Sequence, residues 1–94
     1  MAESRINKQN QFKILYYNSG GTEETWDTGL TISHVAFGIF VARRASGNAE
    51  MYYLCVTNND VVAISDTTRI TIENGKILFN LAIYHTVRGL VLLR

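Results

Sequence analysis

Two histidines and one cysteine are the side chains that could bind a metal ion or act as a nucleophile in this chain. His34 and His85 are far apart in the sequence, and neither belongs to a Cys-x-x-Cys or His-x-x-x-His pattern that would place metal ligands together. Cys55 lies in the apolar run 53–56, whereas a reactive thiol needs a positively charged and partly exposed neighbourhood. We therefore expect no metal site, no cofactor and no catalytic residue, and we expect that the protein is not an enzyme.

Asparagine and aspartate side chains at 58–60 and at Asp66 could offer oxygen atoms to a calcium ion. The spacing of an EF-hand loop is absent. The same residue types are favoured in turns, because their side chains hydrogen-bond the nearby backbone. We interpret these residues as turn formers.

Aromatic side chains are the stronger candidates for a binding site. Tyr16-Tyr17 and Tyr52-Tyr53 are adjacent pairs, and neighbouring residues of a strand point to opposite faces, so one tyrosine of each pair should point away from the core. We predict a ligand-binding surface of Trp26, Tyr17 and Tyr52 that stacks on sugars or on another subunit. The alternative is that both faces are buried, one inside the domain and the other under a neighbour or a loop.

Composition limits the class of protein that carries these residues. The 94 residues suffice for one domain, 47% of them are hydrophobic and only 18% are charged. The net charge of +1 gives no reason to expect nucleic acid as a partner. The low charge content instead favours a surface that is partly covered by another protein.

Turn signals recur about every 8–12 residues, proline is absent, and no segment has the 3.6-residue apolar period of a helix. This pattern predicts an all-β fold, a small antiparallel β-sandwich of jelly-roll-like type with about seven to nine short strands. We assign residues 12–94 to this single domain and residues 1–11 to a polar N-terminal tail or linker. Residues 1–11 do not read as a signal peptide, and no run is long enough to insert into a membrane.

The clearest local prediction is a hairpin over Ile70–Phe79. Asn74-Gly75 is the dipeptide that best supplies the two positive φ angles of a type I′ turn. A two-residue loop places Glu73 opposite Lys76 and continues the pairing to Ile70 and Phe79. One face of this hairpin is apolar and the other is mainly polar, as a two-layer sandwich requires.

A second hairpin is predicted to join residues 34–43 and 50–57. If Arg44 pairs with Glu50, opposite charges close the loop and small side chains of one strand face large side chains of the other. Gly38 in the middle of a strand indicates a bulge or the close approach of another group.

Residues 35–42 and 90–93 are apolar on both faces, although a sheet in a two-layer sandwich has only one inner face. We interpret the second apolar face as a contact between subunits. The residues predicted to form this oligomer interface are Val35, Phe37, Ile39, Val41, Leu90 and Leu92.

Four segments follow one another in an order known from one group of proteins. They are an opening strand with a glycine turn at 13–21, a threonine-rich strand at 25–30, a long strand with its hairpin at 37–48, and the closing hairpin at 70–79. This order, which covers most of the chain, resembles the C-terminal tip, or head, domain of bacteriophage tail fibres and related receptor-binding proteins. The resemblance implies a homotrimeric, non-enzymatic particle tip that binds a host surface receptor, often a glycan.

Two functions follow as expectations. The first is a recognition module at a tail-fibre tip, located on the virion after assembly in the host cytoplasm and otherwise cytoplasmic. The second is a structural or assembly subunit of a viral particle or another protein lattice, with no sugar ligand.

Overall fold

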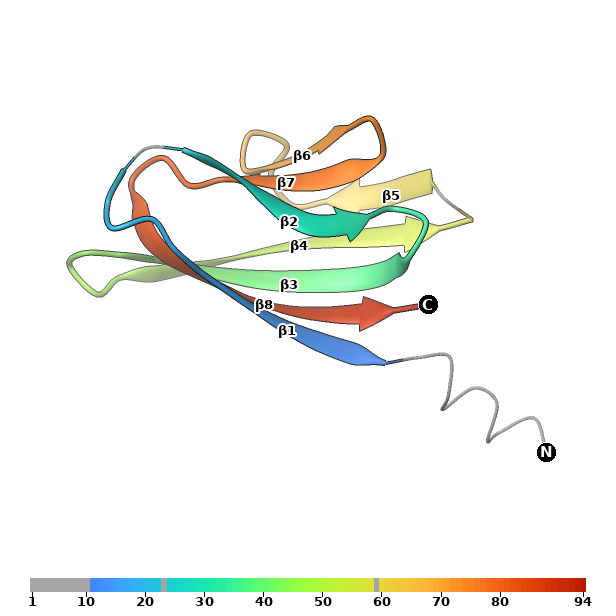
Figure 1. The fold of residues 1–94 in the computed structure, drawn as a ribbon, viewed down its shortest axis with the longest axis horizontal. Coiled ribbons are helices and arrows are strands. Elements are labelled where there is room, and N and C mark those ends of the chain that lie inside the picture. The colour runs from blue at the N-terminus through green and yellow to red at the C-terminus, as the bar shows by residue number, and fades with distance from the viewer. Residues whose placement is uncertain (1–10, 23, 59) are drawn as a thin grey trace.

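The computed structural model describes residues 11–22, 24–58 and 60–94, and it shows two antiparallel sheets packed face to face (Figure 1). Among these residues the strands are β1 (Phe12–Asn18), β2 (Thr25–Thr31), β3 (Val35–Arg44), β4 (Ala49–Thr57), β5 (Asp60–Ile64), β6 (Ile70–Glu73), β7 (Lys76–Asn80) and β8 (Tyr84–Leu93). The prediction of a small all-β sandwich with seven to nine strands is confirmed. Apart from Gln11, the predicted tail lies outside the described residues. Within the described part of the chain, no helix is long and apolar enough to cross a membrane.

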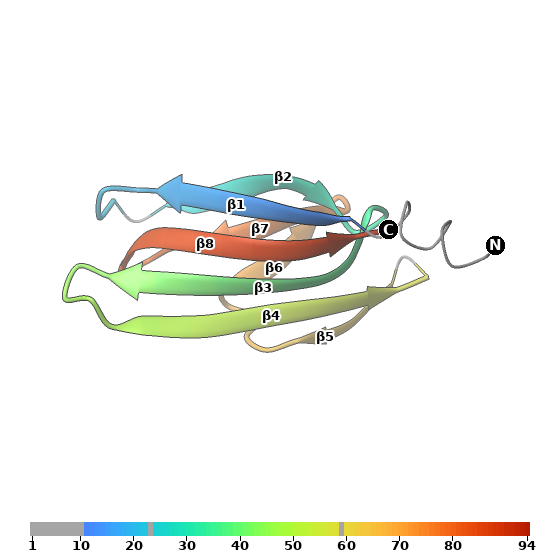
Figure 2. The same cartoon turned by 90° about the horizontal axis from the view of Figure 1, so that it is seen from below.

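The larger sheet has five strands in the order β1-β8-β3-β4-β5, and the smaller sheet has three in the order β2-β7-β6. The last strand, β8, pairs with β1 on one side and with β3 on the other. Figure 2 views the molecule from the side of the large sheet, with the small sheet behind it. The small sheet therefore covers one face of the large sheet and leaves the other, which we call the outer face, without a layer from the described residues.

The predicted β6–β7 hairpin is confirmed in its register. Glu73 pairs with Lys76 and Ile70 pairs with Phe79. Asn74 and Gly75 have φ angles of 52° and 77°, so both adopt the left-handed conformation that a type I′ turn needs. A purely local signal was sufficient here, because a two-residue loop leaves one register.

The predicted register of the β3–β4 hairpin is wrong by two residues. Arg44 pairs through its backbone N–H with the carbonyl of Asn48 at 2.8 Å, across a three-residue loop that ends in Gly47 with φ 97°. This short loop, rather than the Arg44–Glu50 charge pair, sets the register. The charge pair still forms on the diagonal, because Arg44 Nη2 donates to Glu50 Oε1 at 2.8 Å.

Strand β2 runs from Thr25 to Thr31, one residue beyond the threonine-rich strand expected at 25–30. Its pairing with β7 shifts between Asp27 and Thr31, where Gly29 has φ 79°. The buried Thr28 hydroxyl compensates for the irregularity by donating a hydrogen bond to the Ile77 carbonyl at 2.7 Å.

The core lies between the two sheets and centres on aromatic rings. Phe79 of β7 contacts Phe40 of β3 and Tyr52 of β4, with ring centroids 5.6 Å and 5.7 Å apart. Gly89 of β8 makes room for the Phe40 ring, since a Cβ atom at position 89 would lie 2.9 Å from Phe40 Cε1. Gly38 is close to the same ring, as its position within a strand predicted.

Candidate functional site

The predicted aromatic site of Trp26, Tyr17 and Tyr52 does not form as an exposed surface. Tyr52 is a core residue that is only 9% exposed, so its place in the site is wrong. One tyrosine of each adjacent pair does point outward, but the outward ones are Tyr16 and Tyr53, which are 52% and 43% exposed. The sequence shows that the members of a pair face opposite ways, and it does not show which member faces inward.

Tyr17 and Trp26 instead pack against each other between β1, an edge strand of the large sheet, and β2, an edge strand of the small sheet. Their rings stack at 5.2 Å with an interplanar angle of 13°, and both are partly buried against the core. The Tyr17 hydroxyl donates to Glu24 Oε1 at 2.8 Å, and this hydrogen bond raises the pKa of Tyr17. Because each ring covers a face of the other, the pair joins the two sheets more than it offers a platform for a sugar.

A chain of polar contacts joins Tyr52 to the end of the β3–β4 hairpin. Tyr84 donates its hydroxyl proton to Glu50 at 2.5 Å, and Tyr52 donates to the Tyr84 oxygen at 2.5 Å. The hydrogen bonds from Tyr84 and Arg44 lower the pKa of Glu50, and burial raises the pKa of Tyr84. The Arg44 and Arg69 guanidinium groups lie 5.7 Å and 5.5 Å from the centre of the Tyr84 ring. A tyrosine with a raised pKa keeps its proton, so Tyr84 is better suited to a structural hydrogen bond between strands than to the role of a catalytic base.

The histidines and the cysteine do not assemble into a site in the described part of the chain. No group of three or more His, Cys, Asp or Glu side chains there could hold a metal ion. His34 Nδ1 lies 3.0 Å from the Thr31 hydroxyl at the surface, and His85 is partly buried in β8. Asp66 accepts hydrogen bonds from the backbone and side chain of Thr68, which is the turn chemistry that its sequence context predicts. Asn59 lies outside the described residues.

Five of the six predicted interface residues lie on the outer face. Phe37 pairs with Leu92, and Ile39 pairs with Leu90, while the neighbouring residues of both strands point into the core. Val35 is the exception, because it is fully buried. The pairing of β3 with β8 shifts between Val35 and Phe37, and this bulge turns the Val35 side chain to the inner face.

The outer face is a grid of side chains in rows that run across the strands. The first row consists of Phe12, Leu92, Phe37, Cys55 and Ala63. The second row consists of Ile14, Leu90, Ile39 and Tyr53. The third row consists of Tyr16, Arg88, Val41 and Met51. The fourth row is more polar and consists of Asn18, Thr86, Arg43 and Ala49.

Sequence reasoning missed the contributions of β1 and β4 to this grid. Ile14, Phe12 and Met51 are 78%, 66% and 65% exposed. Both strands carry apolar residues at odd and even positions, so the criterion that identified residues 35–42 and 90–93 would have identified them too.

The grid is slightly hollowed. One depression of about 370 Å³ is lined by residues around Leu90, and a second of about 300 Å³ lies between Tyr16 and Arg43. Arg88 lines both depressions, and its guanidinium carbon lies 4.8 Å from the centre of the Tyr16 ring. Arg88 is therefore held over an aromatic face and is not directed straight away from the sheet.

The chain matches no protein-family model, no curated protein and no solved structure at a significant level. The resemblance to tail-fibre tips therefore stays a prediction.

Proposed function

We propose that this chain is a non-enzymatic assembly subunit that associates with further copies of itself through the outer face of its large sheet. The observation that carries the proposal is the apolar grid. Of the two functions expected from the sequence, this is the structural or assembly subunit. A receptor-binding tip would rest on Trp26, Tyr17 and Tyr52, which do not form an exposed platform.

The exposed area supports association. Seven large apolar side chains of the outer face are between 36% and 78% exposed: Phe12, Ile14, Tyr16, Val41, Met51, Tyr53 and Leu90. At about 200 Å² for a large side chain, they leave on the order of 750 Å² in contact with water. This area matches the roughly 800 Å² that each partner buries in a standard interface, and monomers rarely expose apolar patches beyond about 300–600 Å².

The chemistry of the grid favours a second copy as the occupant. Its first two rows carry no charged side chain, and the third carries only Arg88, so an identical surface can meet it with little cost of desolvating charge. A domain of this size buries roughly 60–65% of its unfolded surface, and self-association is an effective way to bury more.

Light scattering on the purified chain tests the proposal. We expect a mass that is a multiple of 10.6 kDa. Leu90→Lys places a charge in the centre of the grid and should reduce the mass to that of the single chain. Leu78→Lys is the matched control, since Leu78 lies on the outer side of the small sheet opposite Asp27 and should tolerate a lysine.

A wild-type chain that remains at 10.6 kDa at every concentration would overturn the proposal. Equal loss of association in both leucine variants would also overturn it, because the effect would then not belong to the outer face. Circular dichroism on each variant verifies that the sheets remain folded.

A further inference from the structure

Charge on the outer face gathers at one end of the strands. Arg88 lies in the third row and Arg43 lies diagonally from it in the fourth. Among the described residues, neither guanidinium forms an ion pair, whereas Arg44 pairs with Glu50. The grid is therefore apolar at its first and second rows and basic at the other end.

This asymmetry limits how two copies can pack face to face. The apolar grid is one continuous patch, and a single self-complementary patch suits a two-fold axis better than a three-fold one. The axis must lie in the plane between the sheets, and the two directions that keep the strands of both copies aligned are along the strands and across them. An axis along the strands would place each row opposite the same row of the other copy. Arg43 and Arg88 of both copies would then lie together, and the described residues of these rows include no carboxylate.

An axis across the strands avoids this repulsion. If it passes through the second row, which is the middle one of the three rows that hold the exposed apolar side chains, the first row of one copy faces the third row of the other. With a rise of about 3.4 Å per residue, the two Arg88 positions are then about 14 Å apart along the strands and the two Arg43 positions about 27 Å apart. Both separations exceed the screening length of about 8 Å at physiological salt, so repulsion is small.

We infer that the partner is one second copy of this chain, packed outer face on outer face about a two-fold axis that runs across the strands through the second row. This inference rests on the proposed function and specifies it further. It replaces the homotrimer expected from the sequence with a dimer in which β4 lies over β4. Met51 of one copy then lies over Cys55 of the other, and Leu90 meets Leu90.

The two orientations predict different neighbours for Met51. In the dimer that we infer, Met51 is close to Cys55 of the second copy. If the axis ran along the strands, β4 would lie over β1 and Met51 would be close to Tyr16 of the second copy. In each orientation the wrong pair is about 20 Å apart, from strand spacings of about 4.8 Å and the rise per residue.

Cross-linking with a short bismaleimide distinguishes the orientations. The first variant, Met51→Cys, keeps the natural Cys55. The second variant combines Met51→Cys with Tyr16→Cys and Cys55→Ser. Both changes of large side chains are at exposed positions, so folding should tolerate them. The wild-type chain is the control, because its Cys55 would face Met51 and not another cysteine.

We expect that most of the first variant migrates as a covalent dimer of twice 10.6 kDa on a denaturing gel, and that the second variant and the wild type do not. Cross-linking of the second variant in place of the first would overturn the orientation. A mass of three chains by light scattering, or a dimer that neither variant cross-links, would overturn it as well. A single-chain mass for the wild type would instead contradict the proposed function itself.

Discussion

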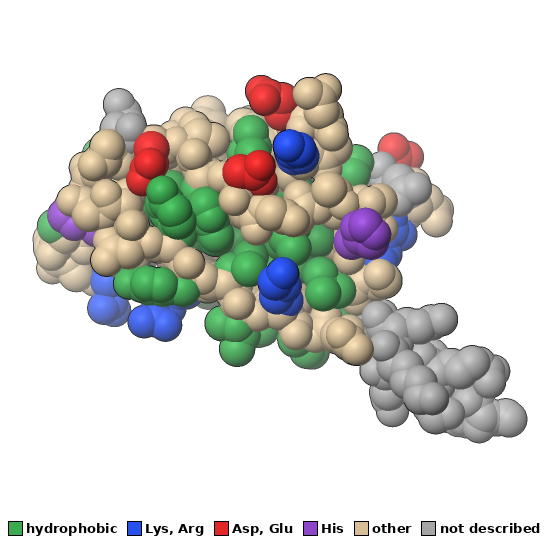
Figure 3. Space-filling model, in the orientation of Figure 1, with side chains coloured by type: hydrophobic (Ala, Val, Ile, Leu, Met, Phe, Trp, Pro, Cys, Tyr) green, Lys and Arg blue, Asp and Glu red, His purple; other side chains and the backbone are tan. Residues whose placement is uncertain are grey.

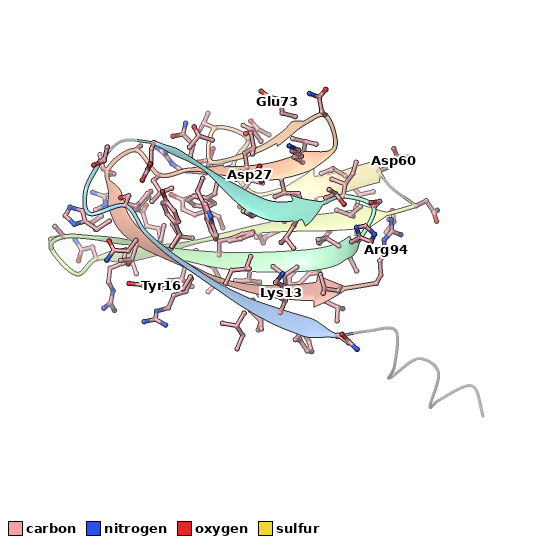
Figure 4. The ribbon with its side chains drawn as sticks, viewed as in Figure 1. Lys13, Tyr16, Asp27, Asp60, Glu73 and Arg94 are labelled. Atoms are coloured by element: carbon pink, nitrogen blue, oxygen red, sulfur yellow. The ribbon has the colours of Figure 1, made fainter. Side chains whose placement is uncertain are left out.

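The outer sides of the two sheets differ in chemistry although both belong to one small sandwich. On the small sheet the outward residues are mostly polar: Thr25, Asp27, Thr71, Glu73, Lys76, Leu78 and Asn80. Figure 4 shows Asp27 and Glu73 on that side of the molecule and Tyr16 on the opposite side. In Figure 3, the acidic side chains lie in the upper part of the view, and hydrophobic and basic side chains lie along the lower edge of the molecule.

The difference shows which of the two surfaces follows the residue pattern of a solvated sheet. An antiparallel sheet with one solvated face alternates between apolar and polar residues, and the β6–β7 hairpin does so. Strands β3 and β8 carry apolar residues on both faces through most of their length. The outward side of the small sheet thus has the mostly polar composition of a solvated face, and the outer face of the large sheet does not.

The largest expected effect is the loss of stability on substituting a residue of the inner face of the large sheet. Phe40 is fully buried, so Phe40→Ala should lower the free energy of unfolding by about 3–5 kcal/mol. Urea denaturation in the monomeric Leu90→Lys background measures this change without a contribution from association. A change below about 1 kcal/mol would mean that the inner face is assigned wrongly.

Phe12→Ala makes the same substitution on the outer face, where Phe12 is 66% exposed. In the same monomeric background it should change the free energy of unfolding by less than about 0.5 kcal/mol. In the otherwise wild-type chain it should weaken self-association by about tenfold, as measured by analytical ultracentrifugation, because loss of an interface aromatic costs on the order of 1.4 kcal/mol or more. Unchanged association would exclude the β1 side of the grid from the interface.

Gly75→Ala tests the turn that determines the register of the small sheet. Gly75 has φ 77°, and a residue with a Cβ atom pays about 1–2 kcal/mol in that conformation. Thermal unfolding should show this loss, while the mass in solution stays the same. A loss of association would mean that the small sheet also takes part in the interface.

The smallest expected effect is a dependence of the free energy of unfolding on pH. Self-association should not show this dependence. The pKa of Glu50 is lowered in the folded state from its ordinary value of 4.5 by hydrogen bonds from Tyr84 and Arg44. A lowered carboxyl pKa stabilises the fold above the unfolded value, and this stabilisation is lost as the pH falls through the folded value. Stability should therefore decline below about pH 4.5, and Glu50→Gln should reduce the decline.

The lowered pKa of Asp66 acts in the same direction, so some acid sensitivity should remain in Glu50→Gln. The described part of the outer face carries no carboxylate, and its association should not change over this range while the chain stays folded. Sedimentation at pH 4.5 and at pH 7 measures this. A strong dependence of association on pH would indicate acidic groups in the contact.

The sequence predicts the fold class and the β6–β7 hairpin because both depend on local signals. The Asn74-Gly75 turn leaves a single register, whereas the β3–β4 register depends on the loop at Gly47, and the charge pair at Arg44 forms in either register. The position of Val35 could not be predicted, because a bulge in β3 reverses the alternation there.

The predicted exposure of Tyr52 is wrong for a related reason. Neighbouring residues of a strand point to opposite faces, so Tyr16 and Tyr17 point apart, and so do Tyr52 and Tyr53. Which tyrosine of each pair points inward depends on which face of the sheet the other sheet covers. The structure places Ile39 and Leu90 on the outer face, and the sequence could indicate this because two apolar faces on one strand are a property of the sequence alone. Their part in an interface between subunits stays a prediction.

Cys55 provides the most direct test that a second copy covers the outer face, since it is the chain's one cysteine and lies half-buried in the first row of the grid. The rate at which a small thiol reagent modifies Cys55 should fall as the concentration of the wild-type chain rises, and it should stay high at all concentrations in Leu90→Lys. A rate that is independent of concentration and equal in the two proteins would contradict the account.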